Sequence, residues 1–368
     1  MRILHAAALL RPPSGILHQM QWEQDAAREL AVDWAVRVFC PAGAVPSSEI
    51  IEESPYASGR AGKGIVGKLI DWVMLRWLYF RWLKSQESTV DVFLLRYYVH
   101  DPFQLVFVIF CKKPVYFVHH TMVGYELAMP GRWRDKVRLA LDQILAGVTI
   151  RAASGIVGVT DEIICYERQR ASQPSKTAFL YPNGIASSAF LPALDLRDNT
   201  PEIIFVASYF MPWHGLDLLL KSMITDDTPC VLHLVGSMSE GDLAMAEKDS
   251  RIVVHGVKRK KEIADIAGRC WGGLSSFALN RNNMSEACTL KVREYLALGL
   301  PVYAGYREML PENFPFYSSG RPDLPEIMRF FLSVRHASRQ EVAGKSMKII
   351  SKKRYLSDLY ENITSTHN

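Results

Sequence analysis

The sequence lacks several features that would assign it to a class of protein at once. Its six cysteines stand singly and form no C-x-x-C pair, so neither a disulfide framework nor a metal site is expected. No apolar run approaches the roughly 18 uncharged residues of a membrane-spanning helix. No G-x-G-x-x-G follows the first apolar run, which argues against a nicotinamide-dependent oxidoreductase. These absences leave a reduced cytosolic chain as the expectation.

The composition is that of an ordinary globular protein. The chain has 368 residues, of which 49% are hydrophobic and 22% are charged, so it is long enough for two domains with a core each. Its first residues, MRILHAAALLRPP, combine a basic residue with an apolar run. Because this run is short, is interrupted by His5 and ends in Arg-Pro-Pro, a buried first strand is expected rather than a signal peptide.

Short apolar runs alternate with longer helical segments along most of the chain. This pattern is typical of the α/β class, in which parallel sheets are covered on both faces. Two series of runs are present, and the Pro- and Asp-rich stretch 190–202 separates them. The runs are 2–9, 34–40, 91–97, 114–120, 155–160 and 177–184, then 202–208, 230–237, 251–256, 272–277 and 300–305. We expect two Rossmann-like domains, 1–186 and 200–345, facing each other across a cleft, and a terminal helical segment, 346–368, that packs on either.

Positive charge is concentrated in the N-terminal half. The whole chain carries +5, whereas residues 60–138 contain 13 Lys and Arg against six Asp and Glu and therefore carry +7. Within this segment, KLIDWVMLRWLYFRWLK (68–84) interleaves basic and aromatic residues. Two interpretations stay open: a helix that makes peripheral contact with an anionic bilayer through 63–84, or a core helix whose charged side chains reach solvent. Nucleic-acid binding is not expected, because the segment is too apolar and no recognition motif accompanies it.

The segment EACTLKVREYLALGLP (286–301) places two glutamates eight positions apart after a predicted strand and a loop. A helix that begins just after Glu286 offers free backbone N–H groups and a positive dipole end, which suit a diphosphate. Lys291 adds a cation. Glu294, one turn further, can accept the hydroxyls of a ribose, and Glu286 meets a group attached to the diphosphate. This layout predicts a nucleotide diphosphate sugar as ligand, although an isolated pair of helical glutamates is also common on solvated surfaces.

The same segment resembles the donor-binding motif of retaining GT-B glycosyltransferases, family 4 in particular. Other stretches agree with that family in order along the chain. ASYFMPWHGLDLLL (207–220) is similar to the first strand and helix of its C-terminal domain, and YPNGI (181–185) to its domain-junction turn. VDVFLLRYY (90–98) and PVYFVHH (114–120) are similar to its N-terminal strands. The resemblance spans about residues 2–363 and implies an N-terminal acceptor-binding and a C-terminal nucleotide-sugar-binding domain.

The resemblance implies roles for individual residues. Glu286 would contact the donor sugar near its anomeric centre, Glu294 the ribose, and the amides of Thr289 and Leu290 the diphosphate. His119 would touch the donor sugar from the N-terminal domain, with His120 in its place if the alignment shifts by one residue. The alternative for His119 is a strand-end histidine that bonds a neighbouring carbonyl.

Other implied donor contacts lie in loops. Gly15 would let the first loop approach the donor closely, and Gly256 and Val257 are expected to line the base pocket. Asn183 belongs to the junction turn. The chain departs from the family pattern at two positions, where Ser208 and His214 replace the arginine and lysine that usually clamp phosphate, so neither supplies the usual positive charge.

The function implied is that of a retaining hexosyltransferase that uses a UDP- or GDP-sugar, without a cofactor and, since no D-x-D motif occurs, without a metal. Its acceptor is expected to be a glycan or a lipid-linked glycan, such as a precursor of lipopolysaccharide or exopolysaccharide at the inner face of the cytoplasmic membrane. Two alternatives stay open. One is an inactive GT-B scaffold that binds a glycan or a partner enzyme, and the other is a nucleotide-sugar 2-epimerase.

Overall fold

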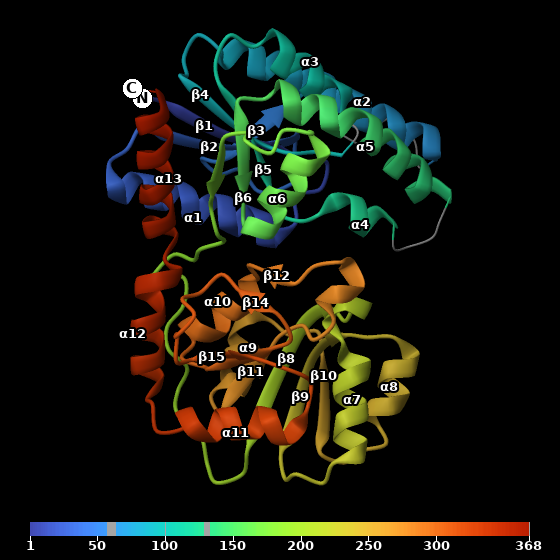
Figure 1. Cartoon of the computed structure of the whole chain (residues 1–368), viewed down its shortest axis with the longest axis vertical. Coiled ribbons are helices and arrows are strands. Elements are labelled where there is room, and N and C mark those ends of the chain that lie inside the picture. Colours follow the sequence, from blue (N-terminus) through green and yellow to red (C-terminus); the bar gives the residue numbers. More distant parts are fainter. Residues whose placement is uncertain (57–63, 100, 129–132, 368) are drawn as a thin grey trace. The chain divides into compact units, whose positions relative to one another are not determined.

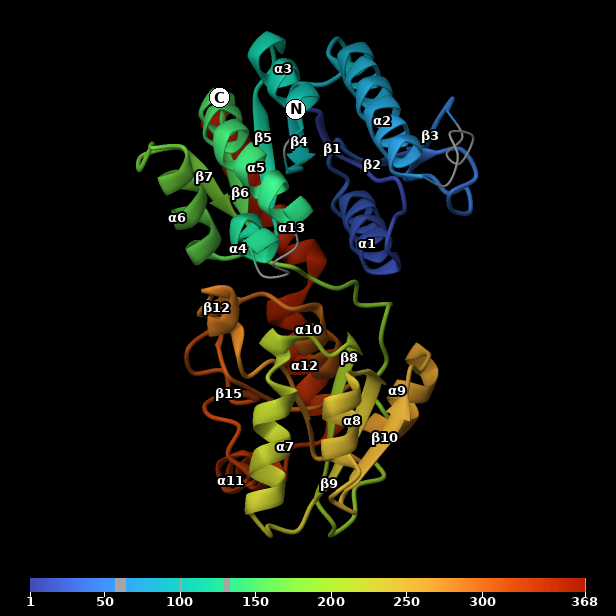
Figure 2. The same ribbon diagram turned by 90° about the vertical axis from the view of Figure 1, so that its right-hand side faces the viewer.

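The computed structural model describes residues 1–56, 64–99, 101–128 and 133–367. The chain divides into two compact units, one of Met1–Pro182 with Lys352–Asn368 and the other of Asn183–Ser351. Figures 1 and 2 label the elements of both units. The stretch 190–202, predicted as a linker, lies inside the second unit.

A parallel sheet forms the centre of the first unit. Its strand order, within the described residues, is β3-β2-β1-β4-β5-β6-β7, and every pair is parallel. The strands are β1 (Ile3–Ala8), β2 (Trp34–Pro41), β3 (Ile51–Ser54), β4 (Val92–Arg96), β5 (Val115–His119), β6 (Gly155–Gly158) and β7 (Ala178–Leu180). β1 and β5 are buried along their whole length, as expected for strands covered on both faces.

Helices cover both faces of this sheet (Figure 1). On one face, side chains of α2 (Ile65–Gln86), α3 (Pro102–Phe110) and α5 (Trp133–Ala152) pack into a core with β1, β4 and β5. On the other face, α1 (Ser14–Leu30) and α13 (Lys352–His367) pack against the same strands. The remaining helices of this unit are α4 (Val123–Ala128) and α6 (Asp161–Arg170).

The second unit contains a second parallel sheet, with the order β10-β9-β8-β11-β13-β15 in the described residues. Its strands are β8 (Glu202–Tyr209), β9 (Val231–Ser237), β10 (Ile252–Gly256), β11 (Gly272–Leu274), β13 (Val302–Ala304) and β15 (Tyr317–Ser319), and a separate pair is formed by β12 (Glu286–Ala287) and β14 (Arg307–Glu308). Residues of α7 (Leu216–Thr225), α8 (Glu240–Ala246) and α11 (Leu324–Val334) share a core on one face; Figure 2 shows α7 and α8 in front of the sheet. The other helices are η1 (Pro212–His214), α9 (Lys260–Ala267), η2 (Leu279–Asn282), α10 (Leu290–Ala297) and α12 (Arg339–Ile350).

The predicted α/β class with two parallel sheets is confirmed. The prediction omitted β3, β12, β14 and β15, because these strands have two to four residues and no continuous apolar run. The terminal segment 346–368, predicted as one helical segment, contains the end of one helix and the whole of another. α12 ends at Ile350, Ser351 is extended (φ −65°, ψ 130°), and α13 then packs on the first unit.

A buried polar cluster joins the start of α13 to the rest of the first unit. The Glu23 carboxylate accepts hydrogen bonds from Trp34 Nε1 (2.9 Å) and the Tyr181 hydroxyl (2.8 Å), and it lies 2.6 Å from His5 Nδ1. Lys352 Nζ lies 4.6 Å from the centre of the Tyr181 ring. Although burial raises the pKa of Glu23, the contacts with His5, Lys352 and Tyr181 override it and lower this pKa to about 2.

Candidate functional site

The segment that carries the two glutamates forms a strand, a cap and a helix. Glu286 and Ala287 form β12, which pairs in parallel with β14, and α10 begins at Leu290. Thr289 caps the helix, because its Oγ1 accepts a hydrogen bond from the Val292 amide (3.5 Å). The amides of the first helical residues, Leu290 and Lys291, have no acceptor within the helix. This end of α10 therefore offers free donors and a positive dipole end, although Glu286 and Glu294 do not share one helix.

Glu286 has a partner that the sequence did not indicate. Its carboxylate accepts a hydrogen bond from Arg307 Nη1 at 2.6 Å, across the β12–β14 pair. The Glu286 side chain is 11% exposed, whereas the Arg307 side chain is 64% exposed. Arg307 is the first residue of the two-residue strand β14, which is too short to show a periodic pattern, so no sequence signal places it beside Glu286. The pair puts a carboxylate and an exposed cation side by side at the edge of residues 286–297, the predicted donor-binding segment, called the donor segment below.

A fully buried ion pair joins α10 to β14. Arg293 and Glu308 have 0% exposed side chains, and Arg293 Nη1 lies 2.5 Å from Glu308 Oε1. Burial raises the pKa of Glu308 although Arg293 opposes this, so loss of hydration outweighs the attraction. Glu308 also accepts a hydrogen bond from the Thr289 amide (3.3 Å). This amide, predicted to bind diphosphate, is therefore already engaged.

Asn183 is part of the same support. Its amide nitrogens donate to Cys288, from the backbone N–H to Sγ (3.0 Å) and from Nδ2 to the carbonyl (2.7 Å). Its own carbonyl accepts a hydrogen bond from Arg293 Nε at 3.0 Å. Asn183 thus holds the residue that precedes Thr289, which makes it a residue that positions the donor segment.

Glu294 and Lys291 line a cavity of about 760 Å³ in the second unit. Lys291 Nζ donates to Glu294 Oε2 at 2.7 Å, so the predicted cation and the predicted ribose acceptor are bonded to each other. Residues of the stretch 188–196 and of α9 also line the cavity. The other lining residues include Phe190, Leu194, Lys260, Lys261, Ala264, Tyr295 and Leu298. The cavity therefore combines apolar walls with a few charged groups, as small-molecule sites do.

Ser208 and His214 lie at and beyond the carboxyl end of β8. Ser208 is exposed and is followed by Tyr209, the last residue of the strand. His214 lies in η1, where its Nδ1 accepts a hydrogen bond from the Met211 amide (2.8 Å). Burial lowers the pKa of His214, so the ring is neutral at pH 7 and brings no positive charge. The Phe277 amide donates to the His214 carbonyl (2.9 Å), which fixes η1 beside the loop that leads to the donor segment.

Two glycines in this region have positive φ, and at one of them a close contact also excludes any side chain. At Gly236, with φ +130°, a Cβ atom would lie 1.6 Å from the Ala207 carbonyl oxygen, so only glycine lets β9 end this close to β8. Gly256, with φ +66° at the end of β10, has open space where a Cβ would lie. Val257 follows it and is 72% exposed. Neither Gly256 nor Val257 lines the 760 Å³ cavity.

The candidates in the first unit have contrasting environments. Gly15 lies within the first turn of α1, not before it, and a Cβ atom added there would meet nothing within 4 Å. His119 ends β5 with a fully buried side chain, stacked on Tyr97 (ring centres 4.7 Å apart) and with Nδ1 3.2 Å from Glu167 Oε1. His120 is the partly exposed member of the pair. The predicted contact of His119 with a donor sugar stays a prediction.

Comparisons with known proteins support the fold. No family model and no curated sequence matches the chain. Among solved structures, it is similar to sucrose-phosphate synthase from Thermosynechococcus elongatus (TM-score 0.69, 15% identity, 99% of this chain and 100% of that one). It is also similar to the lipopolysaccharide outer core galactosyltransferase WaaB (0.65, 10%, 100% of both chains) and to Anabaena HepE in complex with UDP and glucose (0.61, 12%, 99% and 100%). The chain therefore has the fold of the GT-B glycosyltransferases.

Proposed function

We propose that the chain is a retaining glycosyltransferase that moves a sugar from a UDP- or GDP-sugar to a saccharide acceptor. The GT-B fold supports this proposal, and one observation carries it. The side chains of Lys291 and Glu294 line the large cavity of the second unit, and Glu294 lies one turn after the free amides of Leu290 and Lys291 at the start of α10. An anion-binding helix start beside a group that accepts ribose hydroxyls suits a nucleoside diphosphate.

The donor would bind along this segment. The amides of Leu290 and Lys291 would receive the diphosphate, and the Thr289 amide would join them by exchanging Glu308 for phosphate. Lys291 would turn from Glu294 to the diphosphate, which frees Glu294 for the ribose. His214 can donate one hydrogen bond from Nε2, and Gly256 with Val257 would contact the base.

The chemistry would take place at the anomeric carbon of the donor sugar. Its bond to the diphosphate oxygen breaks while a bond to the acceptor hydroxyl oxygen forms on the same face, and the departing oxygen takes the hydroxyl proton. The helix-end amides and Lys291 would stabilise the negative charge that develops on the diphosphate. Glu286, held by Arg307, would orient the sugar.

Calorimetry and thermal shifts with UDP, GDP and their sugars test the donor site. We expect one nucleotide to bind the wild-type protein and to bind the Glu294→Ala variant at least roughly tenfold more weakly, since two ribose hydrogen bonds are lost. Glu341→Ala, which removes an exposed glutamate of α12, is the matched control and should bind as the wild type does. If no nucleotide binds at millimolar concentration, the proposal fails and the inactive-scaffold alternative is favoured.

The acceptor would be lipid-linked, and the first unit has a surface suited to a membrane. An apolar stripe runs along the outer side of α2, consisting of Ile65, Val66, Leu69, Ile70, Val73 and Trp77, all 38% to 71% exposed. Val106, Ile109 and Phe110 of α3 and Ile144 of α5 are also exposed, on the two helices that cover the same sheet face. Single scattered apolar side chains are normal on a protein surface, whereas a group of this size indicates an interaction site.

The charge of the surroundings favours an anionic bilayer as the partner. Exposed basic residues lie on the same three helices and on the loop that follows α3: Lys68, Arg81, Lys112, Lys136 and Arg138. Arg76, in contrast, is buried beside Asp101 (3.5 Å) and cannot meet lipid. Residues 60–63, 100 and 129–132 of the basic segment lie outside the described part of the chain. Within the described part, no helix is long and apolar enough to cross a membrane. We therefore propose peripheral contact at the inner face of the cytoplasmic membrane.

Vesicle sedimentation tests this surface. We expect the protein to pellet with vesicles of phosphatidylglycerol but not of phosphatidylcholine, and Leu69→Glu to weaken the binding. Leu332→Glu is the matched control, because Leu332 is 57% exposed on α11 against 59% for Leu69. If Leu69→Glu instead abolishes a dimer and leaves vesicle binding unchanged, the surface contacts a second copy of the chain and the membrane proposal is wrong.

A further inference from the structure

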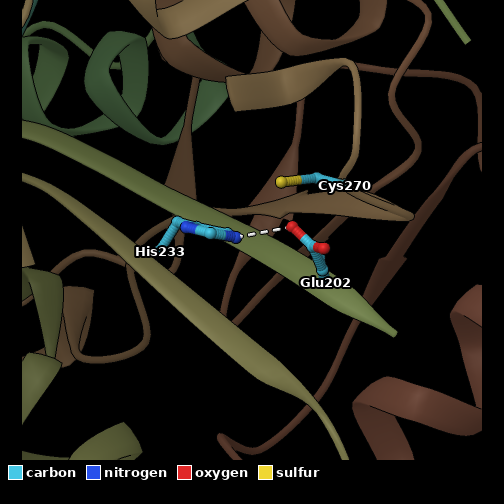
Figure 3. A group of neighbouring side chains, drawn as sticks. All are labelled: Glu202, His233 and Cys270. Atoms are coloured by element: carbon cyan, nitrogen blue, oxygen red, sulfur yellow. Dashed lines mark hydrogen bonds and ion pairs between the residues drawn. The ribbon is translucent and has the colours of Figure 1, made fainter. Parts of the chain in front are cut away.

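Three side chains of different chemistry converge at the amino-terminal edge of the second unit's main sheet (Figure 3). Glu202 is the first residue of β8, His233 the third residue of β9, and Cys270 lies two residues before β11. β8 lies between β9 and β11 in the sheet. A carboxylate oxygen, a ring nitrogen and Sγ lie within 4.8 Å of one another. This cluster lies at the opposite end of the strands from Ser208 and the donor segment.

The spacing of the three atoms is close to that of a tetrahedral metal site. Zn²⁺ binds cysteine sulfur at about 2.3 Å and histidine nitrogen at about 2.0 Å, which places these two ligand atoms roughly 3.5 Å apart. His233 Nε2 already lies 2.8 Å from Glu202 Oε2. Side-chain movements of about 1 Å would therefore bring all three atoms to an ion between them, without a change in the strands.

The charges of the cluster also suit a divalent cation. Among the described residues, no lysine or arginine forms an ion pair with Glu202, whose partner is His233. The Cys270 thiol donates to the Ile266 carbonyl (3.3 Å). On binding Zn²⁺, the thiol would release its proton to solvent, and one carboxylate with one thiolate would neutralise the ion. The side chains of Glu202 and His233 are 17% and 12% exposed, which leaves a path for the ion and a place for water as fourth ligand.

A fourth residue would fix the orientation of the histidine ligand. His233 Nδ1 lies 2.9 Å from His255 Nε2, on the neighbouring strand β10. When Nδ1 carries the proton and donates to His255, the lone pair of Nε2 points toward Glu202 and Cys270. Metal-binding histidines commonly have such a partner on the other ring nitrogen, because it sets both the tautomer and the ring position.

We propose that Glu202, His233 and Cys270 bind one Zn²⁺ ion, with water in the fourth position and His255 as the positioning residue. The set of one sulfur, one imidazole and one carboxylate is among those that zinc prefers. The ion would tie β8 and β9 to the segment that follows α9, and so stabilise the second unit. This inference does not depend on the proposed transferase function.

Metal binding by the full-length, metal-stripped protein tests the proposal. We expect one equivalent of Co²⁺ to give the absorption of a tetrahedral thiolate site, and Zn²⁺ to displace it. Cys270→Ser should abolish the thiolate band, while its hydroxyl can still donate to the Ile266 carbonyl. Cys230→Ser, at a second buried cysteine of the same unit, is the matched control and should retain the band. His255→Phe should weaken binding about 10- to 100-fold.

Three further results separate a built site from incidental binding. Zn²⁺ should raise the melting temperature of the wild type and Cys230→Ser by several degrees, and leave Cys270→Ser unchanged. If Cys270→Ser does not fold, X-ray absorption of the zinc-loaded wild type must show one sulfur neighbour together with nitrogen or oxygen neighbours. An absence of binding at micromolar Zn²⁺, or equal binding by Cys270→Ser and Cys230→Ser, would overturn the proposal.

Discussion

Replacing Glu308 with glutamine tests whether the buried ion pair holds the donor segment. The change preserves the size of the side chain but removes the negative charge beside Arg293, whose side chain is also 0% exposed. The guanidinium would keep the carbonyl oxygens of Asn183 (3.0 Å) and Met309 (3.1 Å) as acceptors, but would have lost its counter-charge. Removing one partner of a buried pair costs about 3–5 kcal/mol.

For a unit of this size, such a loss lowers the melting temperature by on the order of 10 °C. Chemical denaturation of Glu308→Gln followed by tryptophan fluorescence measures it. Because the pair holds the donor segment in place, we expect nucleotide affinity to fall with stability, even though the Thr289 amide would no longer have to leave a carboxylate in order to bind phosphate. The double variant Arg293→Met, Glu308→Leu is the control. Because burial already raises the pKa of Glu308, the pair gains little net energy, and the apolar pair should restore much of the stability.

One outcome would refute this reasoning. If Glu308→Gln unfolds at the same denaturant concentration as the wild type, the interior around Arg293 tolerates an uncompensated charge and the pair does not support the segment. If Glu308→Gln is destabilised but binds nucleotide normally, the pair contributes to folding only, and the link to the donor segment is wrong.

Three other predictions concern separate parts of the molecule. Because the pKa of Glu23 is about 2 in the folded chain against an ordinary 4.5, its contribution of about 3 kcal/mol is present above pH 4.5 and lost as pH falls toward 2; Glu23→Gln should remove this part of the acid dependence in denaturation curves measured from pH 2 to 7. Arg307→Ala should change the free energy of unfolding by less than about 0.5 kcal/mol, since Arg307 is exposed. It should lower turnover on the order of tenfold with unchanged nucleotide affinity, because Glu286 loses the side chain that holds it. Turnover equal to that of the wild type would contradict this role. Gly236→Ala should destabilise the chain by on the order of 3 kcal/mol, because its Cβ would overlap the Ala207 carbonyl, whereas Gly344→Ala, in open space on α12, should stabilise it by about 0.5–1 kcal/mol in the same denaturation assay.

Local patterns in the sequence predicted much of the architecture. The long apolar runs became β1, β2, β4, β5, β8 and β9, because a strand buried on both faces must be apolar throughout. The short strands β12 and β14 could not be predicted in this way. Each has two residues, and their pairing depends on Arg307 returning beside Glu286 after 20 intervening residues.

The candidate site shows the same division. The sequence indicated a helix start after Glu286 with Lys291 and Glu294 on its first turns, because capping, spacing and charge are local properties. It gave no indication that Thr289 is bonded to Glu308, that Arg307 pairs with Glu286, or that His119 is fully enclosed. These depend on which distant segments pack together.

The sequence by itself thus determined the fold class, the order of the longer strands and helices and the place where α10 begins, since each follows from periodicity or from neighbouring residues. Only the tertiary structure decided which charges are paired, which apolar side chains of α2 stay exposed, and that Glu202, His233 and Cys270 meet. Those three residues are separated by more than 30 positions along the chain. No local pattern encodes their meeting, because it results from the order of β9, β8 and β11 in the sheet.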